Sequence, residues 1–185
     1  MPLADETVVQ HTLEWVKSFI VGQNVCPFAK REVEKDSVRI IVVRSKKLEV
    51  ALEELMAEVQ WLDEHADTET TLLVFPTLFK GFHHYLDFVE LAENVMADQG
   101  CDGIYQLATF HPDYCFAETD PDEVSNYTNR SPYPMLHLLR EASLDKAIAF
   151  SGDTSTIPER NIAHMQALGR EQLETQLQQC MHEKS

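Results

Sequence analysis

Hydrophobic positions along the chain follow two different spacings. In three stretches, apolar residues recur every three or four positions, which predicts amphipathic helices. These stretches cover residues 5–22, 48–62 and 85–95. Three shorter runs are rich in apolar and β-branched residues, which is typical of strands that are covered on both faces. They cover residues 38–44, 70–76 and 103–110.

Helices and strands that alternate in this way predict right-handed βαβ crossovers. We therefore expect an α/β fold with a small, mostly parallel sheet of about three to four strands, flanked by helices. No repeat or linker divides the sequence, so residues 1–185 are expected to form a single domain. Thr156 and Glu159 have the spacing of a capping box, which predicts one more helix. The polar, glutamine-rich end of the chain, residues 168–185, is expected to be a frayed helical tail.

The segment TNRSPYPMLHLLRE, residues 128–141, follows a long polar and turn-rich loop. Proline is tolerated in the first helical turn, where N–H groups have no intrahelical partner. We therefore predict a buried apolar helix that begins near Pro134. His137, Arg140 and Glu141 would lie on one face of it, because residues three and four apart in a helix are neighbours. This polar stripe faces either solvent or an internal polar site.

The charge of the chain is more unusual than its composition. With 44% hydrophobic and 25% charged residues, the composition is that of a soluble globular protein. The formal net charge of -16, however, repels phosphate backbones and anionic lipids, which argues against a nucleic-acid partner and against a membrane partner. An anionic ligand would need a local basic pocket.

Export and membrane signals are not recognisable in the sequence. The stretch MPLADETVVQ has neither a basic region nor an apolar core, so no signal peptide is predicted. No apolar run approaches the roughly 20 residues of a membrane span. The four cysteines are scattered, which in such a chain indicates reduced thiols rather than a disulfide framework. We expect a cytoplasmic protein, and the sequence indicates neither a cofactor nor an oligomeric state.

Candidate chemistry begins with His111, which directly follows a predicted strand in the motif FHPDYCF. Ligands of open parallel sheets bind outside the carboxyl ends of the strands. His111 is therefore a candidate general acid or base at that edge. The alternative is a structural histidine that ends the strand and forms a hydrogen bond to a nearby carbonyl group.

Asn129, Arg130 and Ser131 stand immediately before the predicted helix that contains Arg140. Backbone N–H groups at a helix start, together with an arginine side chain, form a suitable site for a carboxylate or phosphate. These four residues are the candidate substrate-binding set. A surface turn in which Ser131 caps the helix is the alternative.

Cys26 lies in the turn-like motif VCPFAK. The second cysteine of a redox turn is replaced by Ala29, and no clear strand precedes the motif, so a thioredoxin-like function is weakly supported. A lone cysteine is more often a small buried apolar residue. Cys26 would be a nucleophile if His111 lay beside it, because an imidazole can accept the thiol proton.

Several motifs together resemble a bacterial family known as domain of unknown function 1415, which occurs as stand-alone proteins mainly in proteobacteria. The motifs are NVCPFA, TLLVFP, YQLATFHPDYCF, NRSPYPMLHLLREAS and IPERN. The positions that match the family's motif are Cys26, Pro27, Phe28, His111, Pro112, Asn129, Arg130, Ser131, Pro132, His137, Arg140 and Glu141. The resemblance covers nearly the whole chain and implies a single-domain protein without an established activity, so it assigns no catalytic role.

Three hypotheses follow. The first is an enzyme, a hydrolase or transferase that acts on a small anionic metabolite, with a catalytic set at the carboxyl edge of the sheet. This set consists of His111, His137, Cys26 and Glu141. The second is a ligand-binding or protein-interaction module without chemistry. The third is a mononuclear metalloprotein in which His111, His137 and Glu141 hold the metal, since two histidines and one carboxylate are a known ligand set.

Overall fold

The computed structural model describes residues 2–182. Its centre is a four-stranded sheet in the order β1-β2-β4-β3. The strands are β1 (Val38–Val42), β2 (Thr70–Val74), β3 (Tyr105–Phe110) and β4 (Met135–Arg140). The β1–β2 pair is parallel, whereas β4 runs antiparallel to both β2 and β3. The expected α/β fold with a small helix-flanked sheet is confirmed, and the inserted antiparallel strand makes the sheet mixed rather than mostly parallel.

The prediction of a helix that begins near Pro134 was wrong, because this segment forms β4, one of the two central strands of the sheet. A strand buried on both faces carries apolar residues at nearly every position, so it resembles a buried helix in sequence. Pro134 stands just before the ladder, where its missing N–H group costs nothing, and its carbonyl accepts the N–H of Phe75 at 2.9 Å. Helix α5 follows β4 without an intervening loop and begins at Glu141.

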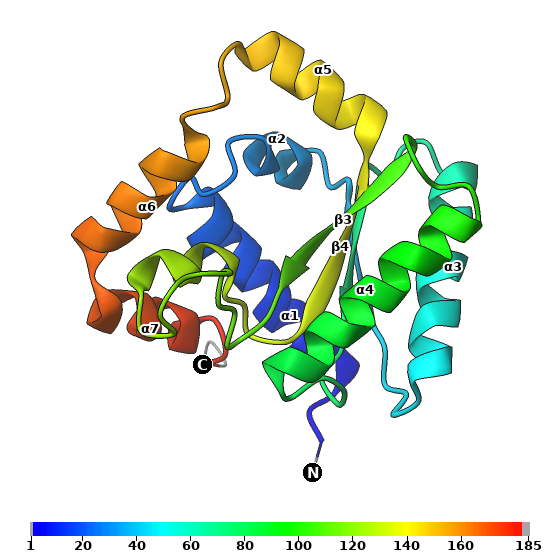
Figure 1. Ribbon diagram of the computed structural model, residues 1–185, viewed down its shortest axis with the longest axis horizontal. Coiled ribbons are helices and arrows are strands. Elements are labelled where there is room, and N and C mark those ends of the chain that lie inside the picture. Colours follow the sequence, from blue (N-terminus) through cyan, green and yellow to red (C-terminus); the bar gives the residue numbers. More distant parts are fainter. Residues whose placement is uncertain (1, 183–185) are drawn as a thin grey trace.

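Helices cover both faces of the sheet (Figure 1). They are α1 (Asp5–Trp15), the π-helix η1 (Val16–Val21), α2 (Ala29–Glu34), α3 (Leu48–Glu64), α4 (Phe82–Asp98), the 3-10 helix η2 (Val124–Asn129), α5 (Glu141–Ser151), α6 (Ile157–Leu168) and α7 (Arg170–Gln179). The predicted helices outside β4 are therefore present, and the expected C-terminal tail includes the regular helix α7. The capping box is not formed, because the Thr156 side chain makes no cap hydrogen bond.

The first predicted helix, residues 5–22, ends in a π-helical turn. The N–H of Gly22 bonds to the carbonyl of Lys17, five residues back, at 3.1 Å. A side-chain Cβ at position 22 would lie 2.1 Å from the carbonyl oxygen of Ser18, so only glycine fits there. Val16 and Ile20 of this wider turn line the pocket described below, as does Trp15 at the end of α1.

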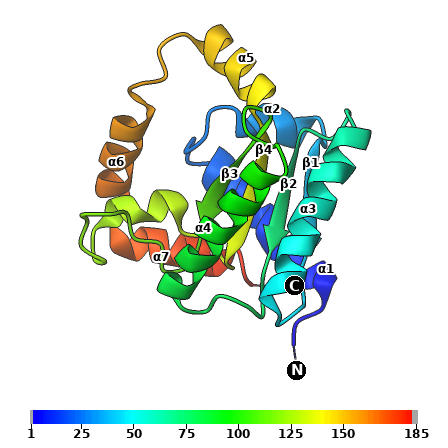
Figure 2. The same cartoon turned by 45° about the vertical axis from the view of Figure 1, so that its right-hand side comes forward.

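Two separate cores lie on the two faces of the sheet because strand side chains alternate. Leu136 and Leu138 of β4 pack with α3 and α4, whereas Met135 packs with α1, η1, α6 and α7. Helix α5 belongs to neither core and contains no buried residue. Figures 1 and 2 show it standing out from the end of β4 and joined to α6 by an extended segment, so that it forms an arch beside the sheet.

Candidate functional site

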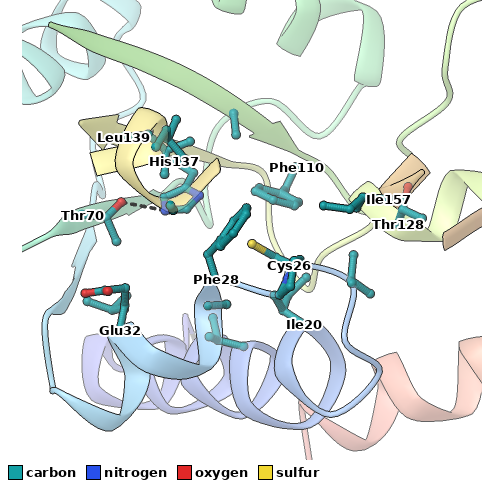
Figure 3. Close-up of a pocket in the computed structure, with 18 of the residues that line it drawn as sticks. Ile20, Cys26, Phe28, Glu32, Thr70, Phe110, Thr128, His137, Leu139 and Ile157 are labelled. Atoms are coloured by element: carbon teal, nitrogen blue, oxygen red, sulfur yellow. Dashed lines mark hydrogen bonds between the residues drawn. The ribbon is translucent and has the colours of Figure 1, made fainter. Parts of the chain in front are cut away.

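A pocket of about 1240 Å³ lies on the face of the sheet opposite α3 and α4. Its walls come from all four strands and from α1, η1, α2, η2, α5 and α6, so segments far apart in the sequence meet around it (Figure 3). Apolar side chains form most of the wall. They include Trp15, Ile20, Phe28, Leu72, Phe110, Leu139, Leu144, Ile157 and Ile162. The pocket therefore offers an apolar interior on the face of the sheet, not at the carboxyl edge where the sequence suggested a site.

His137 lies in the wall of this pocket at the middle of β4, paired with Leu72 on one side and Ala108 on the other. Its Nε2 is 2.7 Å from Oγ1 of Thr70. The same hydroxyl donates its proton to the carbonyl oxygen of Leu138 at 2.6 Å. A hydroxyl has one proton, so Nε2–H of His137 must be the donor toward Thr70, and Nδ1 carries no proton.

The environment of His137 favours the neutral ring. Burial in the apolar pocket lowers the pKa of His137 from 6.5 to about 4, because burial disfavours the charged form. The ring of Phe110 is a near neighbour, with centroids 6.3 Å apart. At neutral pH, His137 therefore presents a neutral imidazole with one unprotonated nitrogen.

Cys26 lines the same pocket, and its sulfur points into it (Figure 3). Burial raises the pKa of the Cys26 thiol, although the backbone N–H groups of Phe28 and Ala29 act in the opposite direction. Among the described residues, no hydrogen bond joins Cys26 to His137. In the view of Figure 3 the ring of Phe28 lies between the two side chains. The site thus combines a neutral thiol with a neutral imidazole.

His111 is placed on the other side of the sheet, so the condition under which it would activate Cys26 is not met. The side chain is fully buried, with 0% exposure. Its Nε2–H donates to the carbonyl of Phe79 at 2.7 Å, and its Nδ1 accepts the N–H of Asp113 at 2.9 Å. Burial lowers the pKa of His111. Both ring nitrogens hold loops together, which is the structural alternative considered for this residue.

The two arginines of the candidate substrate-binding set form hydrogen bonds to main-chain carbonyls. Arg140 donates to the carbonyls of Leu62 and Thr68, at 2.6 and 2.9 Å, and so satisfies groups at and beyond the end of α3. Arg130 donates to the carbonyls of Tyr114 and Pro121, at 3.1 and 2.8 Å. Arg140 touches the pocket wall, whereas Arg130 does not line it.

The remaining candidates are also dispersed. Asn129 lines the pocket, but its amide donates to the carbonyl of Thr109 at 2.9 Å. Ser131 donates to the carbonyl of Tyr133 at 2.7 Å, and no helix begins there for it to cap. Glu141 is the first residue of α5 and does not line the pocket. The helix-start anion site expected around these residues is therefore not formed.

The proposed metal ligands are not assembled. Strand alternation places His111 and His137 on opposite faces of the sheet, and Glu141 lies beyond the far end of β4 from His111. Within residues 2–182, no group of three or more His, Cys, Asp or Glu side chains could hold a metal ion. The described residues therefore do not support the metalloprotein hypothesis, because His111, His137 and Glu141 do not come together.

Charged residues at the pocket were missed by the sequence analysis. Arg31, Lys35 and Lys146 line it, as do Glu32 and Glu69. Arg31 and Lys146 come from α2 and α5, two helices that contain no buried residue, and Lys35 directly follows α2. No hydrophobic periodicity marks α2, so no pattern predicted that basic side chains in or beside this helix would lie near Cys26 and His137.

Comparison with known proteins identifies the family. A family model described as "Protein of unknown function (DUF1415)" matches residues 7–175. The chain belongs to this family. Neither the curated proteins nor the solved structures contain a match to the chain. Among residues 2–182 of this DUF1415 member, no helix has both the length and the apolar character needed to cross a membrane.

Proposed function

We propose that this protein binds an amphipathic small molecule. The apolar body of the ligand would lie inside the pocket, and its anionic group would lie at a basic rim formed by Arg31, Lys35 and Lys146. Sites for small molecules are typically concave and mostly apolar, with volumes of about 300–1,000 Å³ and a few polar groups that orient the ligand. The pocket of about 1240 Å³ is large enough for a ligand of this class. Phe28, Phe110 and Ile157 supply apolar surface around its centre (Figure 3).

The charge balance at the pocket supports an anionic group on the ligand. Within residues 2–182, four basic residues line the pocket but only two acidic residues do, although the sequence contains 31 acidic and 15 basic residues. Arg140 is engaged with main-chain carbonyls, which leaves Arg31, Lys35 and Lys146. Arg31 and Lys35 both approach Glu32, at 3.9 and 4.0 Å, so one carboxylate is shared between two cations. In a chain of net charge -16 this local positive excess is the observation that carries the proposal.

An enzymatic function is the second candidate, and one observation favours it: Cys26 and His137 line the same pocket. In that case the Cys26 sulfur would attack the carbonyl carbon of a bound ester or thioester and expel its alcohol or thiol, while His137 would accept the proton of Cys26 and return it to this leaving group. The raised pKa of the Cys26 thiol and the lowered pKa of His137 both disfavour a thiolate–imidazolium pair. Binding is therefore the function that the geometry supports best.

A pair of probes with the same chain and opposite head groups tests the proposal. Trp15 lines the pocket, whereas Trp61 lies on α3 between Arg39 and His65. In the Trp61→Phe variant, Trp15 is the only tryptophan and its fluorescence reports binding. We expect decanoate to bind at least about tenfold more tightly than decyltrimethylammonium, although the net charge of the protein attracts the cation.

Two charge-reversal variants then locate the anionic group. Lys146→Glu places a negative charge at the rim and should weaken decanoate binding by roughly three- to tenfold. Lys80→Glu makes the same change in net charge at an exposed position outside the pocket and serves as the matched control. Equal affinity for the two probes, or equal effects of the two variants, would contradict the proposed function.

A further inference from the structure

Nδ1 of His137, a polar atom in the apolar wall of the pocket, has no hydrogen-bond partner among residues 2–182. His137 donates through Nε2–H to Thr70, and Nδ1 points away from Thr70 toward the interior of the pocket (Figure 3). Within residues 2–182, no backbone or side-chain group forms a hydrogen bond to this nitrogen. Nδ1 is therefore a bare acceptor, and its environment is the apolar part of the pocket rather than the charged rim.

The acceptor is held in a fixed position. Thr70 is buried and its hydroxyl bonds simultaneously to the His137 ring, at 2.7 Å, and to the carbonyl of Leu138, at 2.6 Å. Because the carbonyl can only accept, the tautomer with a free Nδ1 lone pair is set by the backbone of β4 itself. A hydrogen-bonding group supported by a second group in this way is prepared for a partner before that partner arrives.

A bare acceptor in an apolar wall discriminates between ligands. A polar group that is removed from water without a new hydrogen bond is unfavourable. A ligand that covers Nδ1 with a methylene group leaves the nitrogen unpaired, whereas a ligand that brings an O–H or N–H group to it replaces the lost water. Another acceptor at that position, such as an ether oxygen, gains nothing.

We propose that the natural ligand carries a hydrogen-bond donor on its apolar body, which it presents to Nδ1 of His137. The ligand class is then a hydroxylated or amino-substituted amphipathic anion, such as a hydroxy carboxylate, rather than a simple one. The inference rests on the proposed function and adds the chemical group that the buried part of the ligand must contain. His137 becomes the residue that determines specificity, and Thr70 positions it.

Three probes of matched length test this inference in the Trp61→Phe protein. They are decanoate, 10-hydroxydecanoate and 10-methoxydecanoate. Decanoate ends in a methyl group, the hydroxy probe ends in a hydrogen-bond donor, and the methoxy probe ends in an ether without a donor. We expect the hydroxy probe to bind about five- to tenfold more tightly than the methoxy probe. In the His137→Phe variant this preference should fall below about twofold, because the aromatic volume remains and the acceptor is gone.

A second measurement on the intact protein covers the case in which the His137→Phe variant does not fold. The ¹⁵N resonance of His137 Nδ1 should shift when 10-hydroxydecanoate binds and should stay near its free position with 10-methoxydecanoate. Decanoate binding without any preference for the hydroxy probe, and without that resonance shift, would overturn the inference and leave the proposed function standing. Failure of all three probes to bind would overturn the proposed function and this inference with it.

Discussion

The pH dependence of stability should contain a contribution from His137 that one substitution removes. The folded protein holds the pKa of His137 at about 4, against 6.5 for the free side chain, because the ring is buried in the pocket wall. Between these values the unfolded chain binds a proton that the folded protein does not. Stability therefore rises with pH in this window and falls on acidification, from about pH 6.5 toward pH 4.

The magnitude follows from the two pKa values. Proton linkage gives at most about 3 kcal/mol for the whole window, and about 2 kcal/mol of it is lost between pH 7 and pH 5. The ring is partly exposed to the pocket, so these figures are upper bounds. In His137→Gln the side chain no longer titrates. The variant should therefore lose up to about 2 kcal/mol less than the wild type between the two pH values.

Urea unfolding at pH 7 and pH 5 measures this difference directly, because only the change with pH within each protein is compared. The exposed residue His83 provides the matched control, since His83→Gln also removes one histidine but leaves the pocket intact. If wild type and His137→Gln lose the same stability between pH 7 and pH 5, the buried neutral imidazole is refuted, and with it the assignment of an unprotonated Nδ1.

Three further predictions concern other residues. His111→Ala should lower the free energy of unfolding by about 2–4 kcal/mol, because it removes two buried hydrogen bonds; wild-type stability in urea unfolding together with lost decanoate binding would instead support a functional role. Cys26 should react with iodoacetamide at pH 8 more slowly than free cysteine, and still more slowly with decanoate bound, because burial raises its pKa; fast alkylation at neutral pH would favour the enzymatic candidate. Gly169→Ala should lower the unfolding free energy by about 1–3 kcal/mol, since φ of 78° and ψ of 161° suit only glycine; an unchanged thermal midpoint would contradict this.

The elements that the sequence predicted correctly carry a clear signal of their type. Helices α3 and α4 repeat apolar residues every three or four positions, and the strands β1 and β2 are rich in β-branched residues. Strand β4 has neither signal, because its apolar residues are Met135 and leucines such as Leu136 and Leu138, which fill the cores on both faces of the sheet. The error in this one strand also changed the site, since it placed His137 and Arg140 on one face instead of opposite faces.

The candidate site could be predicted only in part for a related reason. Cys26 and His137 were singled out as chemical groups and do line one pocket. The roles of Arg140 and His111, in contrast, depend on main-chain carbonyls that lie far away in the sequence. Arg140 bonds to the carbonyl of Leu62, 78 residues earlier, and His111 bonds to that of Phe79, 32 residues earlier. Side-chain patterns carry no information about carbonyl groups brought close by the tertiary fold.

Chemical-shift mapping with decanoate tests the central claim most directly. Amide resonances of the uniformly ¹⁵N-labelled protein are followed as decanoate is added. Saturable shifts are predicted around the pocket, at residues such as Phe28, His137 and Ile157, while residues of the α3–α4 core such as Phe88 stay in place. Shifts centred on the α3–α4 face, or none that saturate, would contradict an amphipathic ligand site at this pocket.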